Sequence, residues 1–143
     1  MNWQELNSGA GIRRHHSPFK TFFGGGFECS THRPRVDRRL DIVASTHHDT
    51  FASQDYQRLK CQKIGVAREG LRWHLVERTR GRYDFSSALP VVEAARETGT
   101  QVIWDLCHFG WPDHLDIFSP DFVTALANYG RAFAKWLANE MDG

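Results

Sequence analysis

The sequence predicts an α/β protein that forms part of a (β/α)8 TIM barrel, comprising about the first three βα units. Three apolar, strand-like segments alternate with three helical segments, and successive strands begin about 40 residues apart. The turns from helix to strand are short, whereas the connections from strand to helix are long. Barrels show this asymmetry because one face is a scaffold and the loops of the other face carry function. A doubly wound open sheet of the flavodoxin type is the alternative, although it usually has five strands in this length.

Composition indicates a globular chain with one modest domain and no charged partner. The chain has 143 residues, of which 41% are hydrophobic and 13% aromatic, which is enough to build a core. A net charge of +1 provides no basic surplus for nucleic acid or for an anionic membrane. The N-terminus lacks a signal-peptide pattern, and no run of about 18 apolar residues is present. Cys29, Cys61 and Cys107 lie far apart, which favours reduced thiols over a disulfide framework. We therefore predict a cytoplasmic protein.

Residues 1–18 are interpreted as a flexible leader, and residues 19–143 as the barrel portion. Residues 21–28 form the first predicted strand, and its three glycines leave room for a group to approach the backbone closely. The glycines are not interpreted as a phosphate-binding loop, because no GxGxxG pattern opens directly into a helix and Lys-Ser/Thr is missing. No nucleotide or other cofactor is therefore predicted.

A long polar connection from residue 29 to about residue 50 contains the sequence His47-His48-Asp49. These three residues are possible metal ligands. Adjacent side chains on an extended segment point in opposite directions, however, and no third ligand of suitable spacing is nearby. A solvated loop or helix cap is the favoured interpretation, so no metal site is predicted.

The second unit consists of a predicted helix at residues 51–63 and a strand at residues 64–73. Inward side chains of a barrel strand recur at every second position, which places Val66, Arg68 and Gly70 on one side. A buried, unpaired arginine costs several kcal/mol, so Arg68 requires a carboxylate. The residues leave two possibilities open. The partner is either structural, such as Glu28 or Glu69, or part of an active site.

The third unit has a predicted helix at residues 89–98, which Gly99 caps, and a strand at residues 100–108 that ends at His108. A loop with Phe109 and Trp111 follows, and Pro120 then occupies the first position of the last helix after the capping residue Ser119. Six apolar residues at helical spacing predict that this helix packs against the sheet: Phe122, Leu126, Tyr129, Phe133, Trp136 and Leu137. A complete barrel takes about 250 residues, so the chain is predicted to stop before strand four and to require the remainder of the barrel.

Three segments in this order, AREGLRW, GRYDFSS and VIWDLCHFGWP, resemble the N-terminal part of family 1 glycoside hydrolases, the β-glucosidase-like enzymes of a retaining (β/α)8-barrel clan. The second strand of that family bears an arginine followed five positions later by a tryptophan, as do Arg68 and Trp73 here. Its third strand ends in a histidine, an aromatic residue and a proline, which match His108, Phe109 and Pro112. The similarity covers about residues 20–140, although HFGWP departs from the usual wording of the family.

The resemblance implies roles for five residues at the barrel rim. Arg68 matches the arginine that hydrogen-bonds the catalytic nucleophile, and His108 matches a histidine that contacts sugar hydroxyls, with a structural core histidine as the alternative. Glu28 lies near the place of a sugar-binding glutamine, although an ion pair with Arg68 is an equal alternative. Phe109 and Trp111 either stack on a pyranose ring or pack the loop.

The resemblance also implies a retaining mechanism, which needs two carboxyl groups about 5 to 5.5 Å apart. The family carries them on strands four and seven, so both are expected beyond Gly143. Asn139-Glu140 imitates the Asn-Glu pair of the acid/base, but it belongs to the tail of the last helix and is rejected. We expect an N-terminal glycoside hydrolase fragment that acts on a carbohydrate or glycoside as part of the intact enzyme and is inactive alone. The alternative is a non-enzymatic sugar-binding or partner-binding α/β protein.

Overall fold

The computed structural model describes residues 17–34 and 38–141. In these residues one sheet has the strand order β1-β2-β3, and both neighbouring pairs are parallel. The strands are β1 (Gly25–Gly26), β2 (Val66–Gly70) and β3 (Gln101–Asp105). In the register, Gly26 lies opposite Arg68, and Arg68 lies opposite Ile103. The arrangement matches the predicted parallel alternation of strands and helices.

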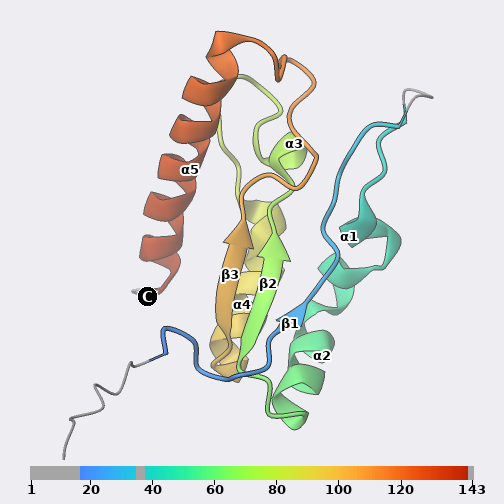
Figure 1. Ribbon diagram of the computed structural model, residues 1–143, viewed down its shortest axis with the longest axis vertical. Coiled ribbons are helices and arrows are strands. Elements are labelled where there is room, and N and C mark those ends of the chain that lie inside the picture. The colour runs from blue at the N-terminus through green and yellow to red at the C-terminus, as the bar shows by residue number, and fades with distance from the viewer. Residues whose placement is uncertain (1–16, 35–37, 142–143) are drawn as a thin grey trace, which may run out of the picture.

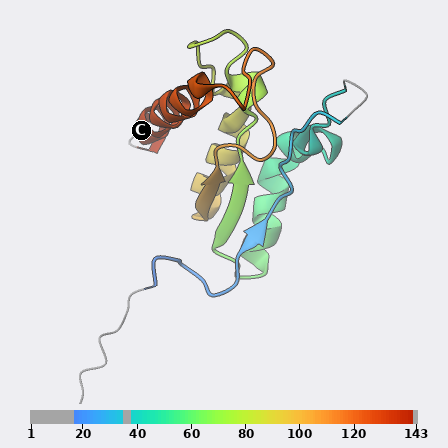
Figure 2. The same ribbon diagram turned by 45° about the horizontal axis from the view of Figure 1, so that its top comes forward.

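Helices cover one face of the sheet and lie beside both of its edges (Figure 1 and Figure 2). The α-helices are α1 (Ile42–Ser45), α2 (His48–Cys61), α3 (Trp73–Val76), α4 (Leu89–Thr98) and α5 (Pro120–Met141), with a 3-10 helix η2 (Ser86–Ala88) before α4. Helix α4 lies behind the sheet, α2 flanks β1 and β2, and α5 runs beside β3 (Figure 1). The tilted view keeps α2 and α5 at opposite edges (Figure 2).

Two apolar clusters hold these layers together. The first lies between the sheet and helices α2 and α4, where Ala67 packs with Tyr56 and Ala94. The second lies beyond the carboxyl ends of the strands and joins α3 to α5. There Trp73 and Tyr129 are both fully buried, and their rings stack with centroids 4.6 Å apart. The apolar stripe of the last helix is therefore packed as predicted, but mainly against α3 and the loops beside it.

The two faces of the sheet differ because side chains alternate along each strand. On β2, Ala67 and Glu69 face the helices and are buried. Arg68 belongs to the other face, and its side chain is 44% exposed. On the neighbouring strand Ile103 is 41% exposed. The predicted shared face of Val66, Arg68 and Gly70 is correct, whereas the expected burial of Arg68 is not.

Local signals determined most helix bounds. Helix α4 has the predicted bounds, and Gly99 ends it in the left-handed conformation with φ 70°. Helix α5 begins at Pro120, as predicted. The helix expected at residues 51–63 begins earlier, at His48, and has non-helical backbone angles at Phe51.

All three strands are shorter than predicted, and β2, expected at residues 64–73, runs only from Val66 to Gly70. Strand β1 contains only two residues, and the space beside its glycine is filled by Leu59, since a Cβ at Gly25 would lie 2.8 Å from Leu59 Cδ2. Strand β3 ends at Asp105, so His108 lies in the following loop. Of the predicted leader, residues 1–16 lie outside the described residues, and the carbonyl of Pro18 accepts a hydrogen bond from Gln101 at 3.0 Å.

Among residues 17–34 and 38–141, no helix combines the length and the apolar character needed to cross a bilayer.

Candidate functional site

The segment that follows β1 and the loop that follows β3 meet at the carboxyl edge of the sheet. The backbone N–H of Thr31 donates to the carbonyl of His108 at 3.2 Å. Two glycines allow this close approach. A Cβ at Gly110 would lie 1.7 Å from Thr31 Oγ1, and a Cβ at Gly70 would lie 2.3 Å from Cys29 Sγ. The sequence thus brings side chains from three strands to one small region.

Charged and polar side chains converge in this region. Arg68 forms an ion pair with Asp105, which ends β3. His108 Nδ1 lies 3.9 Å from Asp105 Oδ2 and 3.7 Å from Glu28 Oε1. Cys29 Sγ lies 3.2 Å from the same ring nitrogen. We call Glu28, Cys29, Arg68, Asp105 and His108 the rim cluster.

Local environment shifts the pKa of two members of the rim cluster. The side chain and backbone of Ser30 hydrogen-bond to Glu28 and hold the pKa of that carboxyl below its ordinary value. Cys29 is only 1% exposed, and burial raises the pKa of its thiol to about 11. At neutral pH the cluster therefore contains a charged glutamate and a protonated thiol.

The observed partner of Arg68 is neither of the two expected carboxylates. Glu69 points to the opposite face of β2, where its Oε1 lies 3.0 Å from His48 Nε2 and accepts a hydrogen bond from Tyr56 Oη at 2.9 Å. Glu28 instead accepts a hydrogen bond from the backbone N–H of Ser30 at 2.9 Å. The prediction of Glu28 or Glu69 as the structural partner is wrong, because Asp105 occupies that position.

The two aromatic residues after His108 line a hollow beside the rim cluster. Phe109 contacts the ring of His108, with centroids 5.0 Å apart, and its own ring is largely exposed. Trp111 packs edge-on against Phe122 at 6.2 Å. The hollow has a volume of about 560 Å³. It is lined by His32, Arg33, Arg39, Phe109, Trp111, Asp113 and Leu115.

Arg39 ties the walls of the hollow together. Its guanidinium donates to the carbonyl of Thr31 at 2.7 Å and to the carbonyl of Trp111 at 3.0 Å, and it also pairs with Asp113. Asp113 also forms a second ion pair, with Arg33 at 2.6 Å. Sequence reasoning treated these arginines only as part of a polar connection.

The fold that carries these residues is similar to part of one solved structure. No protein-family model matches the sequence, and no curated protein matches it. Among solved structures, an exo-beta-1,4-mannosidase, Op5Man5 from Opitutaceae bacterium strain TAV5, aligns with a TM-score of 0.57 and 14% identity. The alignment covers 78% of this chain and 21% of the mannosidase chain, so this chain spans about a fifth of that protein. The fold of this chain matches part of the TIM-barrel fold of that protein. The predicted fold class is therefore confirmed.

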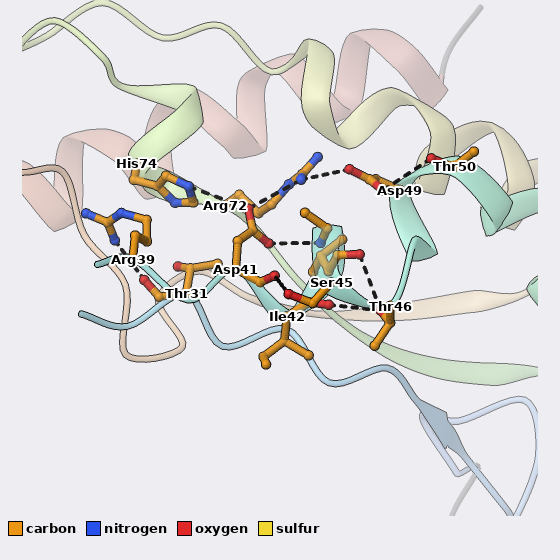
Figure 3. A network of polar contacts seen from close by, with 12 residues as sticks. Thr31, Arg39, Asp41, Ile42, Ser45, Thr46, Asp49, Thr50, Arg72 and His74 are labelled. Atoms are coloured by element: carbon orange, nitrogen blue, oxygen red, sulfur yellow. Dashed lines mark hydrogen bonds and ion pairs between the residues drawn. The ribbon is translucent and has the colours of Figure 1, made fainter. Parts of the chain in front are cut away.

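A network of polar contacts joins the connection between β1 and α2 to residues that follow β2 (Figure 3). Asp41 caps α1 by accepting from the N–H of Ala44 at 3.1 Å. Arg72 donates to Asp49 at 2.9 Å and lies 3.4 Å from the carboxylate of Asp41. Burial and the nearby Arg39 lower the pKa of His74, which faces Asp41 at 3.6 Å, to about 4. Asp49 is thus part of an ion pair and not a solvated loop residue.

His48 was also misjudged from the sequence. It is 2% exposed and lies between Asp55, at 2.8 Å from Nδ1, and Glu69, at 3.0 Å from Nε2. The interpretation of the His-His-Asp sequence as a solvated loop or helix cap agrees with His47, the exposed N-cap residue of α2, but is wrong for the buried His48. The periodicity of α2 carries a usable signal, since His48, Ala52 and Tyr56 recur at every fourth position and are all buried.

Two other motif residues have structural positions. Trp73, which matches the family motif, is fully buried and donates from Nε1 to Glu77 Oε2 at 2.7 Å. Asn139 and Glu140 lie in the last turns of α5, and the carbonyl of Glu140 accepts from Arg96 at 3.2 Å. That end of α5 is opposite to the carboxyl ends of the strands (Figure 1). The rejection of Asn139-Glu140 as a catalytic pair agrees with this position.

Proposed function

We propose that this chain forms the N-terminal part of a retaining glycoside hydrolase barrel of the β-glucosidase-like type, and that its rim cluster lies on the substrate-binding face. One observation carries the proposal. Side chains that lie on or just after three parallel strands, Glu28, Arg68 and His108, converge near the carboxyl edge of a sheet that matches part of a glycosidase fold, where barrels place their chemistry. A carbohydrate or glycoside is the proposed ligand.

Arg68 is the proposed positioning residue for the nucleophile. A guanidinium is always charged and presents several donors to a carboxylate in fixed geometry. With Asp105 beside it, Arg68 already holds one carboxylate, and its half-exposed side chain faces the side of the sheet that a closed barrel encloses. The carboxylate nucleophile of a later strand would approach Arg68 from that side.

His108, Glu28, Phe109 and Trp111 are the proposed sugar contacts. His108 and Glu28 provide ring nitrogens and carboxylate oxygens, which exchange hydrogen bonds with hydroxyl groups. Phe109 is exposed beside them and offers a flat apolar surface to a pyranose ring. The acid/base and the nucleophile themselves are proposed to reside on strands four and seven, so the 143-residue chain alone binds without cleaving.

The proposal is tested on the complete gene product with aryl β-glucosides and β-mannosides. Replacing Arg68 with Gln is expected to lower kcat by about 100-fold or more while KM changes little, because the interaction contributes to the transition state. Arg80→Gln is the matched control, since Arg80 pairs with Asp121 far from the rim cluster. Equal kinetics for Arg68→Gln and wild type would remove Arg68 from the site.

A second candidate function is sugar binding without catalysis, and the hollow beside Phe109 and Trp111 favours it. A volume of about 560 Å³ lies within the range of about 300 to 1,000 Å³ found for small-molecule pockets. Tryptophan fluorescence during titration with mannose, glucose and cellobiose reports binding there. Saturable binding together with a complete lack of turnover by the full gene product would favour this candidate over the enzyme.

A further inference from the structure

The rim cluster contains three different metal-ligating side chains that meet at one point. Cys29 Sγ, His108 Nδ1 and a carboxylate oxygen of Asp105 all lie within 4.8 Å of one another. Cys29 follows β1, Asp105 ends β3 and His108 lies in the next loop, so chain spacing alone gives no metal-binding motif. Cys29 lies so close to Gly70 that a Cβ there would be 2.3 Å from its Sγ, and the backbone N–H of Thr31 donates to the carbonyl of His108 at 3.2 Å, which joins the two segments.

From this geometry we infer a divalent-metal site, of the type that binds Zn²⁺, formed by Cys29, Asp105 and His108. Zinc binds sulfur at about 2.3 Å and nitrogen or oxygen at about 2.0 to 2.2 Å, with tetrahedral geometry. Ligand atoms around such an ion are therefore about 3.3 to 3.6 Å apart. The observed separations of 3.2 Å between sulfur and nitrogen and 3.9 Å between nitrogen and oxygen lie on either side of this range.

The charges near these ligands suit a dication. With the thiol deprotonated, Cys29, Asp105 and Glu28 carry three negative charges, and Arg68 carries one positive charge, which leaves two negative charges opposite the ion. Asp105 Oδ2 also pairs with Arg68, and a carboxylate oxygen can accept from a guanidinium while it binds a metal. Glu28 Oε1 is 3.7 Å from His108 Nδ1 but does not belong to the group of ligand atoms within 4.8 Å of one another, so we place it outside the ligand set. The fourth position remains for water or a ligand hydroxyl.

The cluster does not have the arrangement of a cysteine nucleophile. In a nucleophile–histidine–carboxylate triad, the two partners bind different ring nitrogens of the histidine. Here Cys29 and Asp105 approach the same nitrogen, Nδ1. The thiol is also buried, with its pKa raised by burial, whereas a reactive cysteine has a lowered pKa and is accessible.

Binding is a ligand exchange in which no group is oxidised or reduced. The Cys29 S–H bond breaks, its proton passes to the solvent, and sulfur forms a bond to the metal. His108 binds as the neutral imidazole with its proton on Nε2. The side chains of Asp105 and His108 are 30% and 17% exposed, which gives the ion a route from solvent to the buried sulfur.

The experiment titrates reduced, metal-free protein with Co²⁺ and follows absorption, then displaces Co²⁺ with Zn²⁺. Sulfur ligation is expected to give a thiolate-to-cobalt charge-transfer band in the near ultraviolet, which Zn²⁺ abolishes. Cys29→Ser is expected to lose the band and to weaken Zn²⁺ binding by more than about 100-fold, since even outer-shell partners contribute about 10- to 100-fold. Cys61→Ser is the control and is expected to keep the charge-transfer band and the Zn²⁺ affinity, because Cys61 is an exposed thiol on α2.

Three results of the cobalt titration would contradict the proposed metal site. A wild-type protein without the band at saturating Co²⁺, a Cys29→Ser variant that retains it, or a Cys61→Ser variant that loses it would each overturn the site. Thermal melting of each metal-free variant shows whether it folds. If Cys29→Ser does not fold, Cys29→Ala and Asp105→Asn are tested in its place. The metal site shares His108 with the proposed sugar contacts, but its test is independent of the proposed glycosidase function, because no step of the test measures turnover.

Discussion

At the scale of single residues, His48 on α2 is a buried ionisable group that lies between two carboxylates. Burial disfavours its protonated form, but the hydrogen bonds to Glu69 and Asp55 outweigh that effect and raise the pKa of His48 above its ordinary value. Tyr56 donates to the same oxygen of Glu69, and Phe27 stacks on the imidazole at 3.9 Å. His48 therefore joins α2 to the covered face of β2 through a charged contact.

The raised pKa of His48 predicts a specific pH dependence of stability. Below about pH 6.5, where the unfolded chain also protonates this histidine, its full stabilising contribution is present. As pH rises through the higher folded-state pKa, the contribution is lost. The difference in unfolding free energy between wild type and His48→Gln should thus be larger at about pH 6 than at about pH 9.

Urea unfolding at both pH values measures this difference. Ala52→Gly is the control, because Ala52 is buried on the same helix and does not titrate. Its effect of about 1 kcal/mol should be the same at both pH values. A His48→Gln effect that grows with pH would contradict the assignment.

Two buried tyrosines should respond in opposite ways to loss of the hydroxyl. Tyr56 Oη donates to the carboxylate of Glu69, so Tyr56→Phe is expected to destabilise the fold by about 1.5 to 3 kcal/mol. Tyr129 Oη is buried and has no hydrogen-bond partner within the described chain, so Tyr129→Phe should be neutral or stabilising. Denaturant midpoints of the two variants give the comparison, and equal losses would refute it.

At the scale of elements, the end of β2 depends on a glycine. A Cβ at Gly70 would lie 2.3 Å from Cys29 Sγ and 2.4 Å from its Cβ, and neither atom can easily move. Gly70→Ala should therefore destabilise the protein by about 1 to 3 kcal/mol, as overpacking does. At Gly24 the nearest atom to an added Cβ is the Val66 carbonyl oxygen at 3.8 Å, so Gly24→Ala should have little effect.

Thermal melts of both alanine variants test this pair. If Gly70→Ala melts at the wild-type temperature, Cys29 is not fixed against β2. The same variant provides a check on the rim cluster, because displacement of Cys29 would also weaken the proposed metal binding.

Element bounds were predictable where the signal is local. Helix α4 was predicted with its observed bounds because Gly99 and the helical period lie within a few residues of each other. Strand β1 was predicted too long, because pairing depends on β2 and not on the segment itself. His108 was placed at a strand end, but pairing with β2 already ends at Asp105.

At the scale of the whole molecule, the sheet is covered by helices on one face only. Val102 packs into the cluster shared by α2 and α4, whereas the adjacent Ile103 belongs to the open face. In the 143-residue chain, Val102→Asn should lower the unfolding free energy by about 2 kcal/mol or more, because it buries an amide among apolar groups. Ile103→Asn should change it by no more than about 0.5 kcal/mol.

Urea unfolding of the two variants measures both values. In a closed barrel Ile103 faces the interior, so a large loss for Ile103→Asn in the complete gene product, together with a small one in the 143-residue chain, is the expected pattern. A large loss in the short chain would mean that another part of it covers this face.

The rim cluster was only partly predictable, because its contacts link distant positions. The need of Arg68 for a carboxylate followed from the strand pattern alone. Its partner Asp105, however, is 37 positions away in the sequence. Which carboxylate lies beside Arg68 depends on the register between β2 and β3, which the sequence does not reveal. The pairing of His48 with Glu69 spans 21 positions and was hidden for the same reason. Sequence patterns gave the faces of the strands but not the pairs across them.

Gly110 and Thr31 lie in close contact near the end of β2. Arg39 joins the two segments, because it donates hydrogen bonds to the carbonyls of Thr31 and Trp111. The segment after β1 and the loop after β3 are consequently joined across the end of the middle strand. Displacing either segment would break the hydrogen bonds that Arg39 donates to both.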